Sequence, residues 1–131
     1  MAAFDFKHAT EAFFAEFDEA FTSFDGVVVA ARYAAPYLAV RKDGSSDRFT
    51  SADAVANYFQ RILDEYRRKG CRSCRHRDLD VAAVGKAVVF VTVTWDLLRR
   101  DDSVLSSWRE SYTLVRSRNE LKACVSIDHA Q

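Results

Sequence analysis

The hydrophobic residues of this chain follow a helical period near its start. Four phenylalanines recur at intervals of four, four and three: Phe13, Phe17, Phe21 and Phe24. This spacing places their rings on one face of an α-helix, which we expect over residues 6–24. The alanine-rich segment that follows predicts a short second helix over 27–36, starting near Asp25. That helix should end before Pro36, whose ring disfavours a helical residue in front of it.

A third helical pattern lies between a short strand and the C-terminal half. Residues 37–42 alternate as a strand does, and 43–48 have the composition of a turn with a short returning strand. Thr50 is the expected N-cap of the next helix, and Gly70 is its expected end. Its apolar face is predicted to carry Val55, Phe59, Ile62, Leu63 and Tyr66.

From residue 77 onward the apolar residues alternate with a period of two. Strands are predicted over 77–83, 87–99, 106–116 and 120–129. In the second of these, one face is wholly apolar: Val89, Val91, Val93, Trp95 and Leu97. Helices followed by consecutive strands predict an α+β domain, with the helices on one face of a curved antiparallel sheet.

Composition limits the class of protein. A chain of 131 residues, 49% hydrophobic and with only 4 Gly and 1 Pro, predicts a single folded domain over 1–131. Nineteen basic residues balance nineteen acidic ones, so no nucleic-acid partner is expected. The longest apolar stretch contains Lys86 and is too short to cross a membrane. Three cysteines without an export signal indicate reduced thiols and a cytoplasmic location.

Five segments, in this order, carry a family resemblance: "RYAAPYLAVRKDG", "FTSADAVANYFQRI", "VGKAVVFVTVTWDL", "ESYTLVR" and "SIDHA". The chain resembles the nuclear transport factor 2-like superfamily, and within it the SnoaL-like branch, which is related to ketosteroid isomerase and scytalone dehydratase. The resemblance implies a cystatin-like, cone-shaped α+β barrel, with three N-terminal helices on a strongly curved, mostly antiparallel sheet. It also implies a pocket inside the cone and a homodimer formed through the outer sheet face.

The chain departs from the catalytic pattern of ketosteroid isomerase. In that pattern the strand after the short helix carries an aspartate base, whereas the matching position here is Ala39 or Arg41 and the nearest acid is Asp43. The first helix offers Phe13 and Phe17 where a tyrosine hydroxyl is needed. Isomerisation by that route is therefore not expected.

Two tight turns predict how the last three strands pair. If the dipeptide "DD" forms the first turn, Trp108 lies opposite Trp95. If "RN" forms the second turn, Trp108 also lies opposite His129. Glu110 then lies on the inner face of the sheet, diagonal to His129.

A carboxylate among aromatic rings has two explanations. Glu110 and His129 together form a candidate catalytic acid/base pair, because desolvation raises the pKa of the acid and an imidazolium lowers it again. Alternatively Glu110 pairs with Arg41 or Arg116 and only satisfies a buried charge, while His129 lies at a frayed end. The sequence leaves both open.

The predicted ligand is a hydrophobic or aromatic small molecule, bound without a cofactor. We expect eight aromatic residues to line the pocket: Phe13, Phe17, Tyr33, Tyr37, Phe59, Trp95, Trp108 and Tyr112. One alternative is an isomerase, cyclase or dehydratase that uses Glu110 and His129, with Tyr112 or Tyr33 as hydrogen-bond donor. Another is a protein-protein interaction module.

The segment "GCRSCRHR" carries a possible ligand set for a metal. Cys71, Cys74 and His76 have suitable spacing, but a fourth ligand would have to come from Cys124 or His129 in the last strand. No metal site is therefore expected, and the segment is predicted to be a flexible basic loop with reduced thiols. Its cationic residues could receive a phosphate or an acidic partner, although a solvated surface is the simpler expectation.

Overall fold

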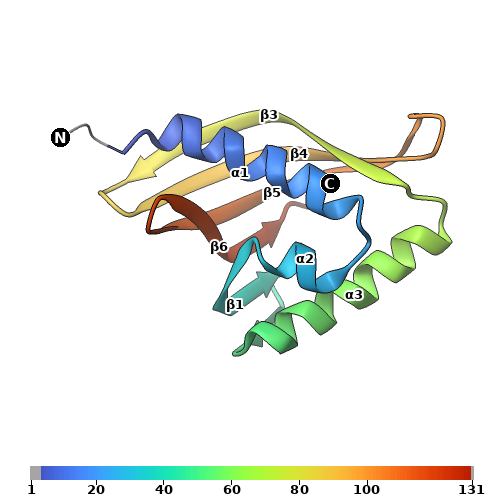
Figure 1. The fold of residues 1–131 in the computed structure, drawn as a ribbon, viewed down its shortest axis with the longest axis horizontal. Coiled ribbons are helices and arrows are strands. Elements are labelled where there is room, and N and C mark those ends of the chain that lie inside the picture. Colours follow the sequence, from blue (N-terminus) through green and yellow to red (C-terminus); the bar gives the residue numbers. More distant parts are fainter. Residues whose placement is uncertain (1–3, 131) are drawn as a thin grey trace.

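A computed structural model of the chain describes residues 4–130, which form three helices and one sheet (Figure 1). The helices are α1 (Phe6–Phe21), α2 (Gly26–Ala30) and α3 (Ala52–Arg68). The strands are β1 (Tyr33–Val40), β2 (Ser46–Phe49), β3 (Ser73–Val84), β4 (Val88–Leu98), β5 (Val104–Ser117) and β6 (Glu120–Asp128). The six-stranded sheet has the order β2-β1-β6-β5-β4-β3, and its pairs are antiparallel except for β1 with β6.

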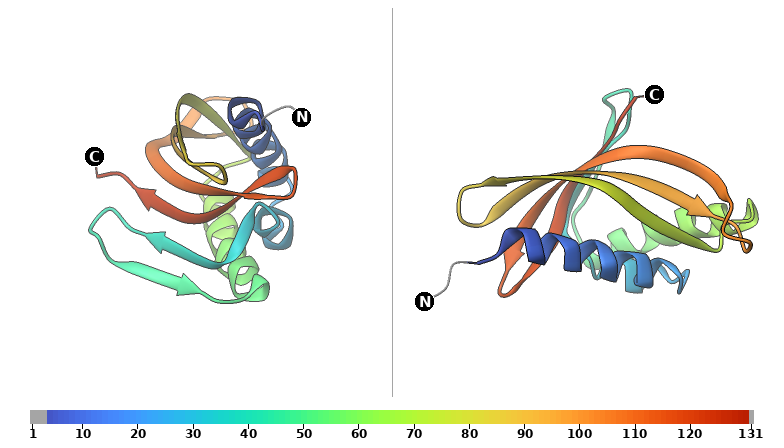
Figure 2. Two further views of the ribbon diagram at one scale, coloured as in Figure 1. Left: turned by 90° about the vertical axis from the view of Figure 1, so that its left-hand side faces the viewer. Right: turned by 90° about the horizontal axis from the view of Figure 1, so that it is seen from above.

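The sheet is strongly curved, and the helices lie on its concave side (Figure 2). Phe13, Phe14 and Phe17 of α1 are buried against the sheet. The predicted α+β class with a curved, mostly antiparallel sheet is confirmed. The three predicted helices are present, but they are not all N-terminal, because α3 follows the β1–β2 hairpin. None of the helices within residues 4–130 is long and apolar enough to cross a membrane.

The first two helices end earlier than predicted. Asp5 caps α1 by accepting a hydrogen bond from the His8 amide, and α1 ends at Phe21. Asp25 caps α2, which ends at Ala30 instead of reaching Pro36. Residues from Tyr33 onward pair in parallel with β6. This pairing across the sheet overrides the helical propensity of the alanines.

Two further boundaries differ from the prediction. The N-cap of α3 is Ser51 rather than Thr50, and its hydroxyl accepts a hydrogen bond from the Ala54 amide. Strand β3 begins at Ser73, so Cys74 and His76 lie on a strand and not in a flexible loop. This part of β3 pairs with the end of β4, which fixes the backbone of the segment.

The predicted register of β4 against β5 is confirmed, since Trp95 faces Trp108 and Val93 faces Glu110. The turn itself spans residues 99–103 and follows an irregularity near Leu98, so it is not the predicted two-residue turn.

The predicted register of β5 against β6 fails part-way along the pair. Leu114 faces Ala123 as expected, but Thr113 faces Val125, so Cys124 is an extra residue in β6. A bulge of one residue exchanges the two faces of a strand beyond it. Glu110 therefore faces Asp128, and not Ile127 as predicted.

Candidate functional site

A cavity lies between the concave face of the sheet and the helices α1 and α3. Its volume is about 120 Å³, and its lining comes from α1, α2, α3, β1 and β3–β6 together with Arg41. It contains seven of the eight aromatic residues expected in the pocket: Phe17, Tyr33, Tyr37, Phe59, Trp95, Trp108 and Tyr112. The structure thus gathers side chains from both halves of the chain around one space.

Phe13 is the exception among the expected pocket residues. Its ring packs edge-on against Phe14, with 4.9 Å between ring centroids, and lies 6.2 Å from that of Phe17. It is buried in the core but does not line the cavity. The helical period places Phe13 and Phe17 on one face, but Phe13 lies one turn further toward the N-terminus and away from α3.

The inner end of the cavity holds buried hydroxyl groups. The Trp95 indole Nε1–H donates to the Tyr112 hydroxyl at 2.9 Å, and this hydroxyl also hydrogen-bonds Tyr33. Tyr37 and Ser126 share a hydrogen bond of 2.5 Å. Burial raises the pKa of Tyr33, Tyr37 and Tyr112. These phenols therefore keep their protons and offer neutral polar groups to a ligand.

Glu110 is the buried carboxyl group of the site, with only 8% of its surface exposed. The Trp108 indole Nε1–H donates to its Oε1 at 2.8 Å. Burial, and next the negative charge of Asp128, raise the pKa of Glu110 to about 8. A carboxyl group that keeps its proton near neutral pH can donate a hydrogen bond or a proton.

Asp128 faces Glu110 from β6 and lines the same cavity. It is exposed, so it lies at the rim while Glu110 lies inside. Although the residue is exposed overall, partial burial of its carboxyl group raises the pKa of Asp128, and a hydrogen bond from Glu110 opposes this rise. The shared proton therefore resides on Glu110, and Asp128 is the acceptor. The site combines an inner acid with an outer carboxylate.

His129 does not lie beside Glu110 on the inner face, as the sequence had predicted. Its Nε2 shares a hydrogen bond of 2.7 Å with the Ser111 hydroxyl, and Ser111 in turn hydrogen-bonds Thr92 on the outer face. The bulge at Cys124 is the cause, because it turns Asp128 inward and His129 outward.

The two arginines proposed as partners of Glu110 have other contacts. Arg41 lines the cavity but forms an ion pair with Asp47. The Arg116 Nε–H donates to the Arg118 carbonyl oxygen. Neither guanidinium neutralises Glu110, so desolvation governs its pKa.

Several residues that line the cavity were not among the eight expected there from the sequence. Ser126 and Asp128 face the cavity only because of the bulge at Cys124, so the sequence pattern did not place them there. Tyr58 and Tyr66 also line the cavity, on the same face of α3 as Ile62. Their spacing from Ile62, four residues on either side, is a helical signal that was already present in the sequence.

The cysteine-containing segment forms a contact between α1 and β3. Asp18 accepts a weak hydrogen bond from the Cys74 thiol at 3.8 Å and shares one of 2.5 Å with His76 Nδ1. Burial raises the pKa of Cys71 and Cys74, which keeps both thiols protonated. Among residues 4–130 no three His, Cys, Asp or Glu side chains are grouped so as to hold a metal ion.

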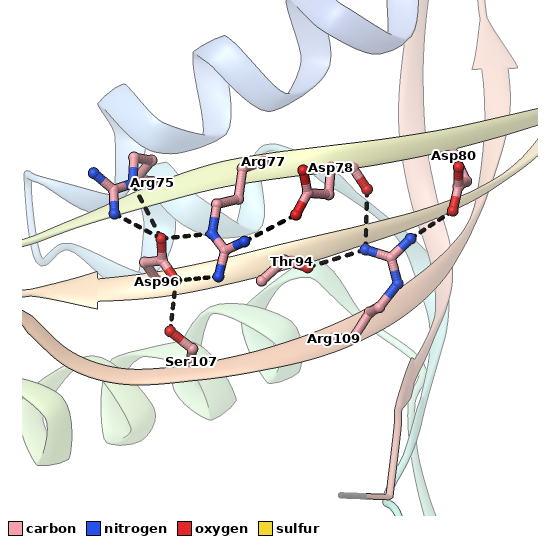
Figure 3. Close-up of polar contacts among 8 residues, drawn as sticks. All are labelled: Arg75, Arg77, Asp78, Asp80, Thr94, Asp96, Ser107 and Arg109. Atoms are coloured by element: carbon pink, nitrogen blue, oxygen red, sulfur yellow. Dashed lines mark hydrogen bonds and ion pairs between the residues drawn. The ribbon is translucent and has the colours of Figure 1, made fainter.

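The outer face of the sheet carries a neutralised charge network (Figure 3). Asp96 is 1% exposed and accepts hydrogen bonds from Arg75, Arg77 and Ser107. Burial opposes ionisation of Asp96, but the hydrogen bonds from these residues outweigh it and lower its pKa to about 2. Positive and negative charges are matched here, so we assign this network to the packing of the strands.

The comparison of sequences with protein families identifies one match, which covers nearly the whole chain. The profile described as "NTF2-like protein (DUF6841)" matches residues 7–131. The chain belongs to this NTF2-like family. The resemblance stated from the sequence is thereby confirmed at the level of the NTF2-like superfamily. No curated protein matches the sequence of this NTF2-like chain.

Solved structures share the fold of this NTF2-like chain at low sequence identity. A cystatin-like protein of unknown function from Nostoc punctiforme has a TM-score of 0.77 and 11% identity, over 99% of this chain and 96% of its own. Aln2 from a Streptomyces species has a TM-score of 0.73 and 16% identity, over 94% of this chain and 89% of its own. A protein named as a candidate scytalone dehydratase, from Novosphingobium aromaticivorans, has a TM-score of 0.67 and 12% identity, over 93% of this chain and 81% of its own. These likenesses show the fold alone.

Proposed function

We propose that this NTF2-like protein binds a hydrophobic or aromatic small molecule inside its cone. The observation that carries the proposal is the partly open cavity of about 120 Å³, whose lining combines many aromatic rings with a few polar groups. Apolar walls with a few polar groups are typical of small-molecule sites. A dry cavity of similar size accommodates a benzene ring, so the fitting ligand is about one ring in size.

The polar groups indicate where such a ligand is oriented. The Tyr112 hydroxyl and the carboxyl group of Glu110 lie toward the cavity, and Asp128 offers an acceptor at the rim. A ligand acceptor can take the hydrogen bond of the Glu110 proton in place of Asp128. A single-ring compound with a carbonyl or hydroxyl group satisfies these partners without leaving one of them unpaired.

We also propose that the protein belongs to the SnoaL-like branch and is located in the cytoplasm. Its three free cysteines support the cytoplasmic location.

Filling the cavity is expected to abolish binding of single-ring ligands. Ala39 is buried and lines the cavity, so Ala39→Leu adds carbon atoms where the ring would lie. We expect the affinity for phenol, measured by NMR titration, to fall at least about tenfold. The control is Ala83→Leu at an exposed site on β3. Unchanged phenol binding in a folded Ala39→Leu protein would contradict the proposed pocket.

Acid/base catalysis is a second candidate, favoured by the two facing carboxyl groups of different burial. An enzyme of the isomerase, cyclase or dehydratase type would use Glu110 as acid and Asp128 as base, in place of the predicted Glu110 and His129. Unequal environments that hold one carboxyl group protonated and leave its neighbour as acceptor are a recurring arrangement for such chemistry.

The test of catalysis compares two variants on a panel of single-ring enones and hydroxyketones. Glu110→Gln should lower kcat by about 100-fold or more, because it removes the transferable proton. His129→Gln should change kcat less than about threefold, since His129 bonds Ser111 on the outer face. An equal loss of kcat in both variants would show that His129 also takes part in catalysis. Turnover that survives Glu110→Gln would exclude the acid role.

A homodimer through the outer sheet face also remains a proposal. Phe90 and Val84 are exposed apolar side chains on strands of this face, which supports a second copy of the chain as the partner.

A further inference from the structure

We infer that the end of the molecule near Gly70 binds a small-molecule phosphate monoester. The site is a shallow groove, open to solvent and lined by five residues: Gly70, Arg72, Arg99, Arg100 and Asp101. It does not overlap the lining of the cavity inside the cone. The inference is therefore independent of the proposed function.

Pairing of β3 with β4 brings the two sides of this groove together. The Arg72 amide donates to the Leu98 carbonyl oxygen at 2.8 Å, and Ser73 faces Leu98. The segment after α3 and the β4–β5 turn consequently lie at the same end of the molecule (Figure 1). Arg72 and Arg99 thus line one groove although they are far apart in the sequence.

Backbone carbonyl oxygens hold two of the guanidinium groups in place. Arg72 Nη1 donates to the carbonyl oxygens of Arg67 and Cys71, at 3.2 and 2.8 Å. Arg99 Nη1 donates to the Ser103 hydroxyl and the Val104 carbonyl oxygen, at 3.3 and 3.0 Å. These acceptors are neutral, so they orient the arginines without cancelling their charge. Among residues 4–130, neither side chain uses its Nε or Nη2 in a hydrogen bond or an ion pair, so these nitrogens are left for a ligand.

The charge of the groove distinguishes it from the other arginines of the fold. No ion pair within residues 4–130 involves Arg72, Arg99 or Arg100. The arginines drawn on the outer face, in contrast, all bind carboxylates (Figure 3). Asp101 is the one acid in the lining, and its Oδ1 accepts hydrogen bonds from the Ser103 amide and hydroxyl. Three arginines and one aspartate leave two positive charges.

A phosphate monoester matches this charge and geometry. It carries nearly two negative charges at pH 7, and its oxygens accept paired hydrogen bonds from guanidinium groups. The groove is open to solvent, which leaves room for the group that carries the phosphate. A long polyanion is disfavoured because the chain has no net charge and because Arg68 and Lys69, next to the groove in the sequence, are paired with Glu65.

Calorimetric titration of the full chain with phenyl phosphate tests the inference. We expect one saturable site with a Kd on the order of 1 mM at low salt, and weaker binding of the monoanion phenyl sulfate. The double variant R72Q/R99Q should weaken binding at least about tenfold. Arg68→Gln is the matched control, because Arg68 is a nearby arginine already paired with Glu65; its expected change is less than about twofold.

Asp101→Asn gives a test of opposite sign. The asparagine Oδ1 can still accept the hydrogen bonds from Ser103, while the negative charge is removed. Phenyl phosphate should then bind about threefold more tightly or better. Three outcomes overturn the inference: no saturable binding, an equal loss in Arg68→Gln, or tighter binding of a single-stranded oligonucleotide than of phenyl phosphate.

Discussion

The free energy of unfolding of Glu110→Gln is expected to depend much less on pH than that of the wild-type protein. Between about pH 5 and about pH 8 the wild type should lose roughly 3 to 5 kcal/mol more than the variant. The physical cause is the burial of Glu110, which raises its pKa to about 8 in the folded protein.

The sign follows from where the proton is bound. Below the ordinary pKa of 4.5, Glu110 is protonated in both the folded and the unfolded chain, so it adds no pH dependence. Between that value and about 8 the unfolded chain releases the proton while the folded protein keeps it. Raising the pH therefore stabilises the unfolded state, until the folded protein also ionises and the difference levels off.

Urea denaturation at a series of pH values measures this effect. The glutamine side chain in Glu110→Gln would still accept from the Trp108 indole and donate to Asp128, so the variant retains the packing of the site. Glu120→Gln is the control, because Glu120 is exposed on β6 and should leave the pH dependence as in the wild type. Parallel curves for Glu110→Gln and the wild type would show that Glu110 is not a buried neutral acid.

Gly26→Ala is expected to destabilise the protein by about 3 kcal/mol. A Cβ atom at Gly26 would lie 2.3 Å from the Ala56 carbonyl oxygen and 2.8 Å from the Gln60 amide nitrogen. Both atoms belong to the backbone of α3, which cannot move away as a flexible side chain could. The substitution must therefore separate α2 from α3.

The sign of this effect distinguishes packing from helix propensity. Alanine in place of glycine inside a helix would by itself stabilise by about 1 kcal/mol. Separation of the helices would also strain the hydrogen bond from the Gly26 amide to Gln60 Oε1, now 2.7 Å long. Val27→Ala on the same helix is the control, since Val27 is 69% exposed. Equal or higher stability of Gly26→Ala in urea denaturation would refute the close contact.

Much of the fold follows from patterns that a single strand or helix carries by itself. The alternation from Val89 to Leu97 predicts an apolar inner face, and these side chains are buried. The helical spacing from Phe13 to Phe21 likewise predicts the buried face of α1. Such patterns are local, because each element must cover one face whatever its neighbours are.

The start of β1 was set by tertiary pairing. Residues 33–36 have a helical composition, yet Tyr33 pairs with Ala123 across the sheet. Hydrogen bonds to β6 and burial of the Tyr33 ring outweigh a propensity of a few tenths of a kcal/mol per residue.

In the candidate site too, the sequence determined some features and the tertiary structure determined others. The sequence by itself determined that Glu110 lies on the inner face between Trp108 and Tyr112, because alternation in β5 requires it. Only the tertiary structure decided its partner. One extra residue at Cys124 turns Asp128 toward the cavity and His129 away from it. No local pattern marks that bulge, since it arises from how β6 must bend between β5 and β1 in a strongly curved sheet.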